Sequence, residues 1–408
     1  MTTLRIPFTL LAIATLIAAC GKSEMEEPAT TVAAAPATYG ADAFFTTTSH
    51  ALAGGYAWSP DDTALLVSSD ETGIFNAYAL ASADGAKTPL TTSTIDSTYA
   101  VSWFPNDVRV LFTADQGGNE LDHLFVRELN GETRDLTPGD KVKAEFLGWS
   151  GDGEFFFAYT NERDAQAFDV YRYAAKDYVR ALIFENVDAF DVSTISPDGS
   201  TIALVKQRTS ADSDVYLLDT TAKDSAPQLI TAHEGNVSHG VYAFTRDSKK
   251  LVYSTNEHGE FDQAWSYDLD SGEKAPLVSA NWDVLFVAYS HSGRYRVSGT
   301  NDDARTVVRI LDNTTGKELE LPGLPPGDLA QIRFSRDEEK IALMLSTDTS
   351  PNDVYTVNLS AGTYTRLTHA LNPAINENDL VATEVVRYPS YDGVEIPSIL
   401  YRPKVSSA

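Results

Sequence analysis

The chain has 408 residues, 43% of them hydrophobic and 10% aromatic, and its 58 acidic residues against 31 basic ones give a net charge of −27. This composition agrees with a secreted globular protein. An acidic excess of this size opposes binding to nucleic acid or to anionic lipid head groups, because both are recognised by patches of lysine and arginine. We therefore expect no nucleic-acid partner and interpret the acidic residues as a solvated surface.

Residues 1–19 have the pattern of a signal peptide. Arg5 is followed by an uncharged, mostly apolar run of 14 residues, from Ile6 to Ala19. A run of that length is too short to span a bilayer comfortably, so the pattern favours a cleaved secretion signal over a permanent transmembrane helix.

The end of this segment, Ile17-Ala18-Ala19-Cys20-Gly21, resembles a bacterial lipoprotein box. The resemblance implies that Cys20 receives a diacylglyceryl group and becomes the new N-terminus. Gly21 in place of aspartate implies sorting to the outer membrane, and hence a lipid-anchored periplasmic protein. The alternative is an ordinary signal cleaved after Ala19, which would leave a soluble periplasmic protein. Cys20 is the only cysteine, so no disulfide can form within the molecule.

Residues 20–40 are predicted to form a flexible tether. From Lys22 to Gly40 the residues are mostly small, polar or acidic, include two prolines and show no apolar periodicity. Such a segment would let a folded domain stand off a membrane surface.

A tight turn then recurs seven times. Proline presets the backbone angle of the first corner of a turn, and aspartate, asparagine or serine can bond its own nearby backbone. The central residues of these turns follow one another at intervals of 45, 46, 46, 49, 45 and 45, a period typical of propeller blades. The turns are Ser59-Pro60-Asp61, Phe104-Pro105-Asn106, Ser150-Gly151-Asp152, Ser196-Pro197-Asp198, Thr245-Arg246-Asp247, Ser290-His291-Ser292 and Ser335-Arg336-Asp337.

Each turn lies between segments with strand patterns. An apolar segment with alternating side chains precedes it, as in residues 56–58 and 332–334, and a nearly continuous apolar segment follows it, as in residues 65–67. A short fourth segment comes after a further polar turn. The third segment carries an aromatic residue in six of the seven units, namely Tyr78, Phe125, Tyr171, Tyr216, Trp265 and Tyr355.

Four strands per unit predict an all-β fold, a seven-bladed β-propeller over residues 41–373. The large rings of the third strands are expected to fill the space between neighbouring blades. A β-sandwich is the alternative, but sandwiches lack a longer repeat of this regularity. A helical solenoid is excluded, because no stretch after residue 40 keeps an apolar period of 3.6 for long.

No motif for catalysis, metal or cofactor binding is found, so we assign no catalytic residue, no metal ligand and no cofactor. The chain lacks a Gly-x-Ser-x-Gly nucleophile elbow. Its closest histidines, His233 and His239, lack the His-Glu-x-x-His spacing of zinc sites. Asp268-x-Asp270-x-Gly272 is similar to a calcium loop but lacks the remaining ligands, and a hairpin turn explains it better.

Two polar clusters are expected in loops between second and third strands, at residues 161–164 and 256–260. Such loops can line one mouth of a propeller, which makes Asn161, Glu162, Arg163, Glu257 and His258 candidate contacts for a substrate. The alternative is that these side chains are simply solvated.

Residues 374–408 are interpreted as a linker and a hairpin. Asp392-Gly393 lies between two alternating apolar segments, which is a strong hairpin signal. The passage YPSYDGVEIPSILYRP at residues 388–403, with the repeats before it, closely resembles serine peptidases of the prolyl oligopeptidase family. The passage is similar to the start of their α/β-hydrolase domain, and the resemblance extends from about Ala43 to Pro403.

The resemblance implies a propeller that caps a catalytic domain and restricts access to short peptides or unfolded ends. No position here matches the motifs of the family's catalytic triad, and a hydrolase domain of ordinary size needs roughly 200 further residues. We therefore expect the substrate-gating propeller of a lipid-anchored serine peptidase. The hydrolase part would come from a continuation of this chain or from a separate subunit. The alternative is a stand-alone periplasmic propeller that binds proteins or peptides.

Overall fold

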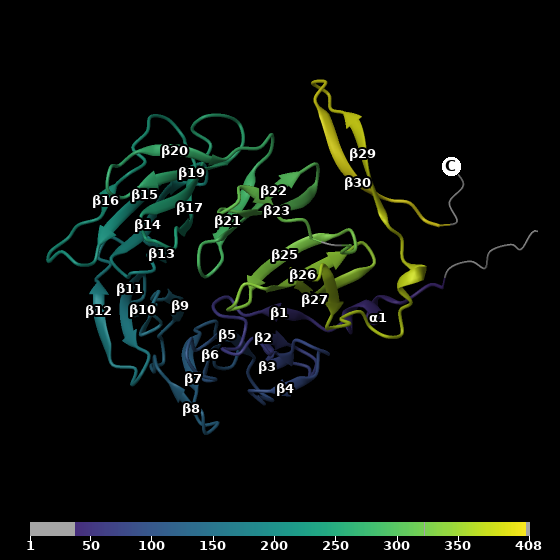
Figure 1. Ribbon diagram of the computed structural model, residues 1–408, viewed down its shortest axis with the longest axis horizontal. Helices are drawn as coiled ribbons and strands as arrows, with labels where there is room; N and C mark the ends of the chain where they lie inside the picture. The colour runs from purple at the N-terminus through teal and green to yellow at the C-terminus, as the bar shows by residue number, and fades with distance from the viewer. Residues whose placement is uncertain (1–36, 322, 405–408) are drawn as a thin grey trace, which may run out of the picture. The chain divides into compact units, whose positions relative to one another are not determined.

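The repeating turns of the sequence build seven antiparallel sheets of four strands each. The computed structural model describes residues 37–321 and 323–404, and contacts divide the chain into the units Met1–Ala37 and Thr38–Ala408. Within the second unit the seven sheets are arranged as the blades of a β-propeller, so the predicted fold is confirmed (Figure 1). None of the helices in the described part is long and apolar enough to cross a membrane.

The blade strands follow one another in chain order within every sheet. Blades 1 to 4 comprise β1 (His50–Leu52), β2 (Ala64–Ser69), β3 (Asn76–Ala81) and β4 (Lys87–Pro89); β5 (Thr98–Trp103), β6 (Val110–Ala114), β7 (His123–Arg127) and β8 (Thr133–Asp135); β9 (Ala144–Trp149), β10 (Phe155–Asp164), β11 (Ala167–Ala174) and β12 (Arg180–Phe184); and β13 (Asp191–Ile195), β14 (Thr201–Thr209), β15 (Asp212–Asp219) and β16 (Gln228–Leu229).

Blades 5 to 7 are built in the same way. They comprise β17 (His239–Phe244), β18 (Lys250–Thr255), β19 (Gln263–Asp268) and β20 (Lys274–Val278); β21 (Val284–Tyr289), β22 (Tyr295–Asp302), β23 (Arg305–Asp312) and β24 (Lys317–Glu318); and β25 (Asp328–Phe334), β26 (Lys340–Thr347), β27 (Ser350–Asn358) and β28 (Thr363–Arg366).

The turn between the first and second strands is held by its own side chains, as its sequence predicts. In blade 4 the Ser196 hydroxyl donates to Asp198 Oδ1 at 2.6 Å and accepts from the backbone N–H of Thr201 at 2.9 Å. The corresponding hydrogen bonds from Ser59, Ser150 and Thr245 lower the pKa of the aspartates that accept them. In these four blades the turn therefore fixes the hairpin formed by the first and second strands.

The fourth residue of this turn lies in the left-handed region of the backbone in six of the seven blades, Asp107 of blade 2 being the exception. In the three of these six turns that lack glycine, the fourth residue links two blades. Ser248 has φ of 57°, and its hydroxyl accepts from the N–H of Asp198 in the preceding blade at 3.1 Å. Glu338 has φ of 58°, and its carboxylate accepts from the N–H and the hydroxyl of Ser292 at 2.7 and 2.8 Å. These departures from the Ser-Pro-Asp-Gly pattern thus have a structural role.

Asp62 has the same left-handed backbone conformation, and its side chain links blades 7 and 1, where the ring closes. It has φ of 55° and is 8% exposed. Its carboxylate accepts from the backbone N–H of Arg336 at 2.7 Å and of Asp337 at 3.1 Å. The Trp58 indole N–H also donates to the Arg333 carbonyl at 2.9 Å. Since the two blades share no strand, side chains and loops hold the ring closed.

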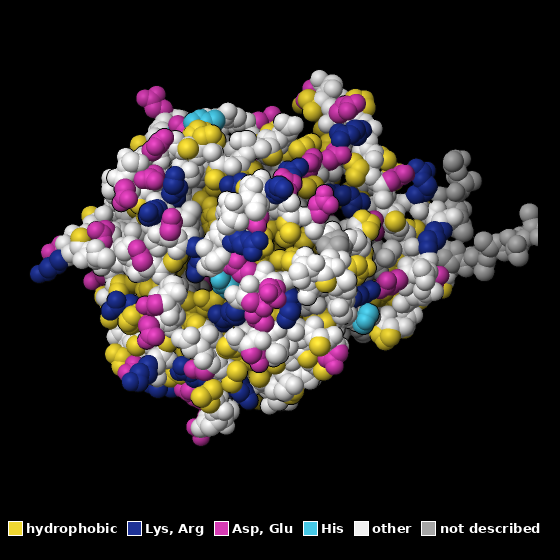
Figure 2. Space-filling model, viewed as in Figure 1, with side chains coloured by type: hydrophobic (Ala, Val, Ile, Leu, Met, Phe, Trp, Pro, Cys, Tyr) yellow, Lys and Arg dark blue, Asp and Glu magenta, His cyan; other side chains and the backbone are white. Residues whose placement is uncertain are grey.

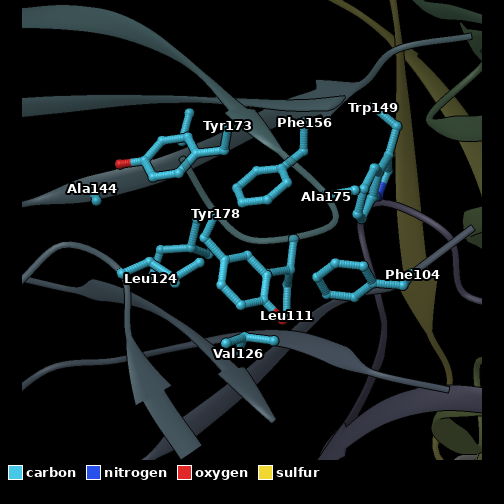
Figure 3. Close-up of a cluster of buried hydrophobic side chains, with 12 residues drawn as sticks. Phe104, Leu111, Leu124, Val126, Ala144, Trp149, Phe156, Tyr173, Ala175 and Tyr178 are labelled. Atoms are coloured by element: carbon cyan, nitrogen blue, oxygen red, sulfur yellow. The ribbon is translucent and has the colours of Figure 1, made fainter. Parts of the chain in front are cut away.

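The hydrophobic core is divided among the blade interfaces. Each of the seven core clusters joins one pair of neighbouring blades, and together they cover all seven interfaces of the ring. Between blades 2 and 3, Phe156 stacks on Tyr173 with ring centroids 4.9 Å apart, and Trp149 meets Phe104 edge-on at 5.0 Å (Figure 3). The third-strand aromatics contribute as predicted, since Tyr78 packs in the cluster that joins blades 1 and 7.

The two ends of the propeller lie side by side. The N–H of Thr48 donates to the Ala370 carbonyl at 2.9 Å, which ties α1 (Ala41–Phe45) and the following segment to the linker after β28. Tyr39 donates to Asp379 at 2.6 Å, next to the 3-10 helix η1 (Glu377–Asp379). Tyr39 belongs to the segment predicted as a flexible tether, and the flexibility of that segment stays a prediction.

The predicted C-terminal hairpin is present as β29 (Thr383–Pro389) and β30 (Glu395–Tyr401), which pair only with each other. Thr383 is held by Asp348 at 2.7 and 2.8 Å and by Arg305 at 2.7 Å. Asp348 and Arg305 lie in or beside the turns between the second and third strands of blades 7 and 6. The hairpin therefore starts at the end of the propeller that these turns form.

Much of the hairpin's apolar surface is uncovered. The exposed fraction is 53% for Tyr388, 45% for Ile399 and 58% for Tyr401. Figure 2 shows hydrophobic and charged side chains mixed over the hairpin at the upper right. A hairpin of two strands is marginally stable alone, so this segment is suited to join a larger sheet.

Candidate functional site

A cavity of about 1000 Å³ follows the innermost strands of the propeller. It extends along β9 from Lys143 to Trp149, and therefore along the whole length of that strand. Six of the seven blades contribute the equivalent residue of the segment that precedes the first turn, three positions before that turn begins. These residues are Tyr56, Val101, Leu147, Tyr242, Val287 and Ile332.

In blade 1 the segment that contains Tyr56 does not form the strand that the sequence predicts. Residues 56–58 are not a strand, and only Trp58 forms an isolated bridge, with Leu65. Gly54 and Gly55 interrupt the strand, and a Cβ atom at Gly55 would lie 2.7 Å from the Ser102 side chain. The lack of a side chain at Gly55 allows this close approach to blade 2 and brings Tyr56 to the cavity wall.

Tyr56 reaches across the cavity. Its ring lies 4.8 Å from that of His291 in blade 6 and 6.3 Å from that of Trp149 in blade 3. The Arg336 guanidinium lies 3.5 Å from the centre of the same ring. These residues are at the turns between first and second strands, whereas the hairpin contacts the turns between second and third strands. Because strands in each blade alternate in direction, the aromatic group narrows the end of the channel away from the hairpin.

This narrow end carries positive charge. Arg246 and Arg333 line the cavity, and the Arg246 Nε–H donates to the His291 carbonyl at 3.1 Å. Burial lowers the pKa of His291 to about 4, and the charges of Arg336 and Arg246 act in the same direction. The His291 side chain is therefore neutral at pH 7, between two arginines.

The sequence contains a signal for this cluster at the turn centres. Arg246, His291 and Arg336 are the central residues of the fifth, sixth and seventh turns, where the other turns have proline or glycine. Three successive blades thus place a cationic or titratable side chain at one level of the ring.

The residues predicted at the substrate mouth do not line this cavity. Residues 161–164 end strand β10 instead of forming a loop, so that assignment is wrong. Asn161 accepts from the Lys143 N–H at 2.6 Å, and Glu162 pairs with Arg180 at 3.0 Å. Arg163 makes two hydrogen bonds of 2.7 Å to the buried carboxylate of Asp169. These partners explain the three side chains as parts of blade 3.

The second cluster does form the loop that was predicted. The N–H of Glu257 donates to Thr255 Oγ1 at 3.0 Å, and the His258 ring lies 4.2 Å from that of Trp265. Neither residue lines the central cavity, nor do Asn161, Glu162 and Arg163. Their contact with a substrate stays a prediction. Cys20, the predicted lipid-attachment residue, lies outside the described residues.

The fold and the cavity define the class of protein: a seven-bladed β-propeller with a lined central channel and a protruding hairpin. The family model for the prolyl oligopeptidase N-terminal β-propeller domain matches residues 89–370, which is more than half of the chain. The chain therefore belongs to the prolyl oligopeptidase family, and the resemblance seen in the sequence is confirmed. No curated protein matches the chain at a significant level.

The solved structures similar to this chain include prolyl peptidases. One, from a study of inter-domain dynamics in two prolyl endopeptidases, is 16% identical with a TM-score of 0.67 over 89% of this chain and 56% of its own. Prolyl oligopeptidase B from Galerina marginata is 12% identical with a TM-score of 0.64, and the match covers 90% of this chain and 57% of the enzyme. The same enzyme bound to a 35-residue substrate is also 12% identical, with a TM-score of 0.63, and the match covers 87% of this chain and 55% of the enzyme. The chain spans just over half the length of these proteins.

Proposed function

We propose that this chain is the gating propeller of a serine peptidase, which admits peptides to an α/β-hydrolase domain and excludes folded proteins. The observation that carries the proposal is the hairpin β29–β30. It starts at the wider end of the channel, is bonded to blades 6 and 7, and presents apolar side chains that a hydrolase sheet would cover. The nucleophile, acid and base would lie in that hydrolase domain, either on a continuation of this chain or on a separate subunit.

The channel supports a selection by size. A cavity of about 1000 Å³, crossed at one end by Tyr56, can hold a short extended peptide. A folded domain is far wider than such a cavity. Because the seven blade interfaces hold the ring closed, the walls cannot part without breaking a packed core cluster.

We further propose that Cys20 carries a lipid anchor that holds the protein at the outer membrane on the periplasmic side. Two or more acyl chains bind a membrane stably, at about 0.8 kcal/mol for each buried methylene. Replacing Cys20 with serine should move the protein from the membrane fraction to the soluble fraction. Unchanged fractionation would contradict the anchor.

The nucleotide sequence after codon 408 tests the link to a hydrolase domain. We expect a continuation or a neighbouring reading frame that encodes Gly-x-Ser-x-Gly, followed by an aspartate and a histidine. A stop codon followed by unrelated genes would refute the peptidase proposal and leave a propeller that binds peptides or proteins on its own.

A further inference from the structure

The narrow end of the channel concentrates positive charge in a strongly acidic protein. Arg246 and Arg336 are contributed by the turns of blades 5 and 7, on either side of His291, and Arg333 by the end of β25. The chain as a whole has a net charge of −27. A cationic cluster against that background is a local feature that general composition does not explain.

None of these three arginines is neutralised. Among residues 37–321 and 323–404, no carboxylate oxygen lies within 4.0 Å of a guanidinium nitrogen of Arg246, Arg333 or Arg336. Other arginines of the propeller do pair with buried carboxylates, as Arg366 does with Asp353 at 2.6 Å. The cluster therefore lies without a paired carboxylate in a partly desolvated cavity, where burial lowers the pKa of Arg333 and of Arg336.

Arg246 is placed to bind a ligand. Its Nε–H is held by the His291 carbonyl at 3.1 Å, which orients the guanidinium plane, and within the described residues this is the one hydrogen bond that its guanidinium makes. Arg246 lines the central cavity and also two smaller pockets beside the turns of blades 3 to 6, so a ligand can reach this side chain at the narrow end of the channel. A guanidinium with two free N–H groups matches the two oxygens of a carboxylate.

Arg336 strengthens the positive potential from behind Tyr56. Its guanidinium stacks on the Tyr56 ring, and its Nε and Nη2 are buried without a hydrogen-bond partner in the described residues. Charges in a cavity with walls of low dielectric are screened less than charges at a surface. The pKa of His291 is lowered first by burial and then by the charges of Arg336 and Arg246.

We propose that Arg246 binds the carboxylate of a peptide held in the channel, its C-terminal carboxylate in the first place. The inference rests on the proposed function, in which the channel admits peptides. The neighbouring walls suit the rest of such a ligand, because Tyr56 and Trp149 offer aromatic faces and Ile332 an aliphatic one. A peptide held in this way would have its carboxyl end at the narrow end of the channel and its remaining residues directed toward the hairpin side.

Isothermal titration calorimetry on the 408-residue chain tests the site with an N-acetylated, otherwise uncharged hexapeptide of alanine and phenylalanine, prepared as the free acid and as the C-terminal amide. We expect the acid to bind at least about tenfold more tightly than the amide, as one charge-assisted bidentate contact provides. Arg246→Gln should bind acid and amide with equal affinity. Arg309→Gln is the matched control, because Arg309 is an exposed arginine on β23, and it should retain the preference.

The outcomes separate this site from the proposed function. Equal binding of acid and amide by the unmodified protein, or a preference that survives in Arg246→Gln, would overturn the carboxylate site and leave peptide admission intact. Failure of both peptides to bind would refute peptide admission and the site together. Inorganic phosphate that competes as strongly as the peptide acid would indicate a general anion site and would also overturn the inference.

Discussion

Replacing Asp62 with alanine is expected to lower the free energy of unfolding by about 3 kcal/mol. The carboxylate accepts two backbone hydrogen bonds from blade 7 and is 8% exposed, so alanine would leave two N–H groups of Arg336 and Asp337 without an acceptor. Alanine would also keep the left-handed backbone of this position without a local hydrogen bond to compensate for it. Urea denaturation followed by tryptophan fluorescence measures the change.

Ser248→Ala is the matched control for Asp62→Ala. Ser248 has the same backbone conformation and links blades 4 and 5 through one neutral hydrogen bond, so its loss should cost about 1 kcal/mol. Asp62→Asn, which retains a side-chain oxygen acceptor, should fall between wild type and Asp62→Ala. Equal effects of Asp62→Ala and Ser248→Ala would contradict a special role of Asp62 in closing the ring.

Acidification from pH 6.5 to pH 4 is expected to destabilise the propeller strongly. Burial lowers the pKa of His50, His239 and His291 to about 4 each. The unfolded chain therefore binds more protons than the folded chain between about pH 6.5 and pH 4. The stabilisation by these neutral histidines is complete above pH 6.5 and is lost as the pH falls, by up to about 3 kcal/mol for each residue.

His233 opposes this trend in part. Its pKa is raised by the hydrogen bond to the Thr231 carbonyl and by Asp212 and Asp214, so its contribution is present at low pH and is lost as the pH rises through the raised value. The three neutral histidines outnumber it, and we expect their effect to dominate.

His239→Phe tests the origin of the acid sensitivity. Neither ring nitrogen of His239 has a hydrogen-bond partner among the described residues, so phenylalanine keeps a ring at this site and removes the titration. Urea denaturation between pH 7.5 and pH 4 should show a shallower loss of stability in His239→Phe than in wild type. An unchanged slope would show that other groups cause the acid sensitivity.

The fold could be predicted from the sequence because the residues that specify it lie close together in the chain and recur in each blade. The Ser196-Pro197-Asp198-Gly199 turn and its variants fix the hairpins through hydrogen bonds within five residues, so their spacing alone predicts seven blades. The aromatic residues of the third strands indicated blade packing for the same reason. The interruption of the strand at Gly54 and Gly55 was harder to predict from the sequence. Glycine is needed at position 55 because the Ser102 side chain of the next blade leaves no room for a Cβ atom there.

The candidate site was less accessible because it is assembled from residues about 45 positions apart. Arg246, His291 and Arg336 each occupy a turn centre, and their meeting at one end of the channel follows only when the ring is closed. The prediction of a loop at residues 161–164 was wrong for the opposite reason. These residues look like a free polar loop, yet Arg163 is bound by Asp169, which lies six residues further along the chain.

Gating is tested most directly by joining this chain to its hydrolase domain and comparing two substrates with the same cleavable bond, one a short peptide and the other a stably folded protein. The account predicts that the peptide is cleaved, the folded protein is not, and deletion of residues 41–373 abolishes the discrimination. Cleavage of the folded protein at the rate of the peptide, with the propeller in place, would contradict it.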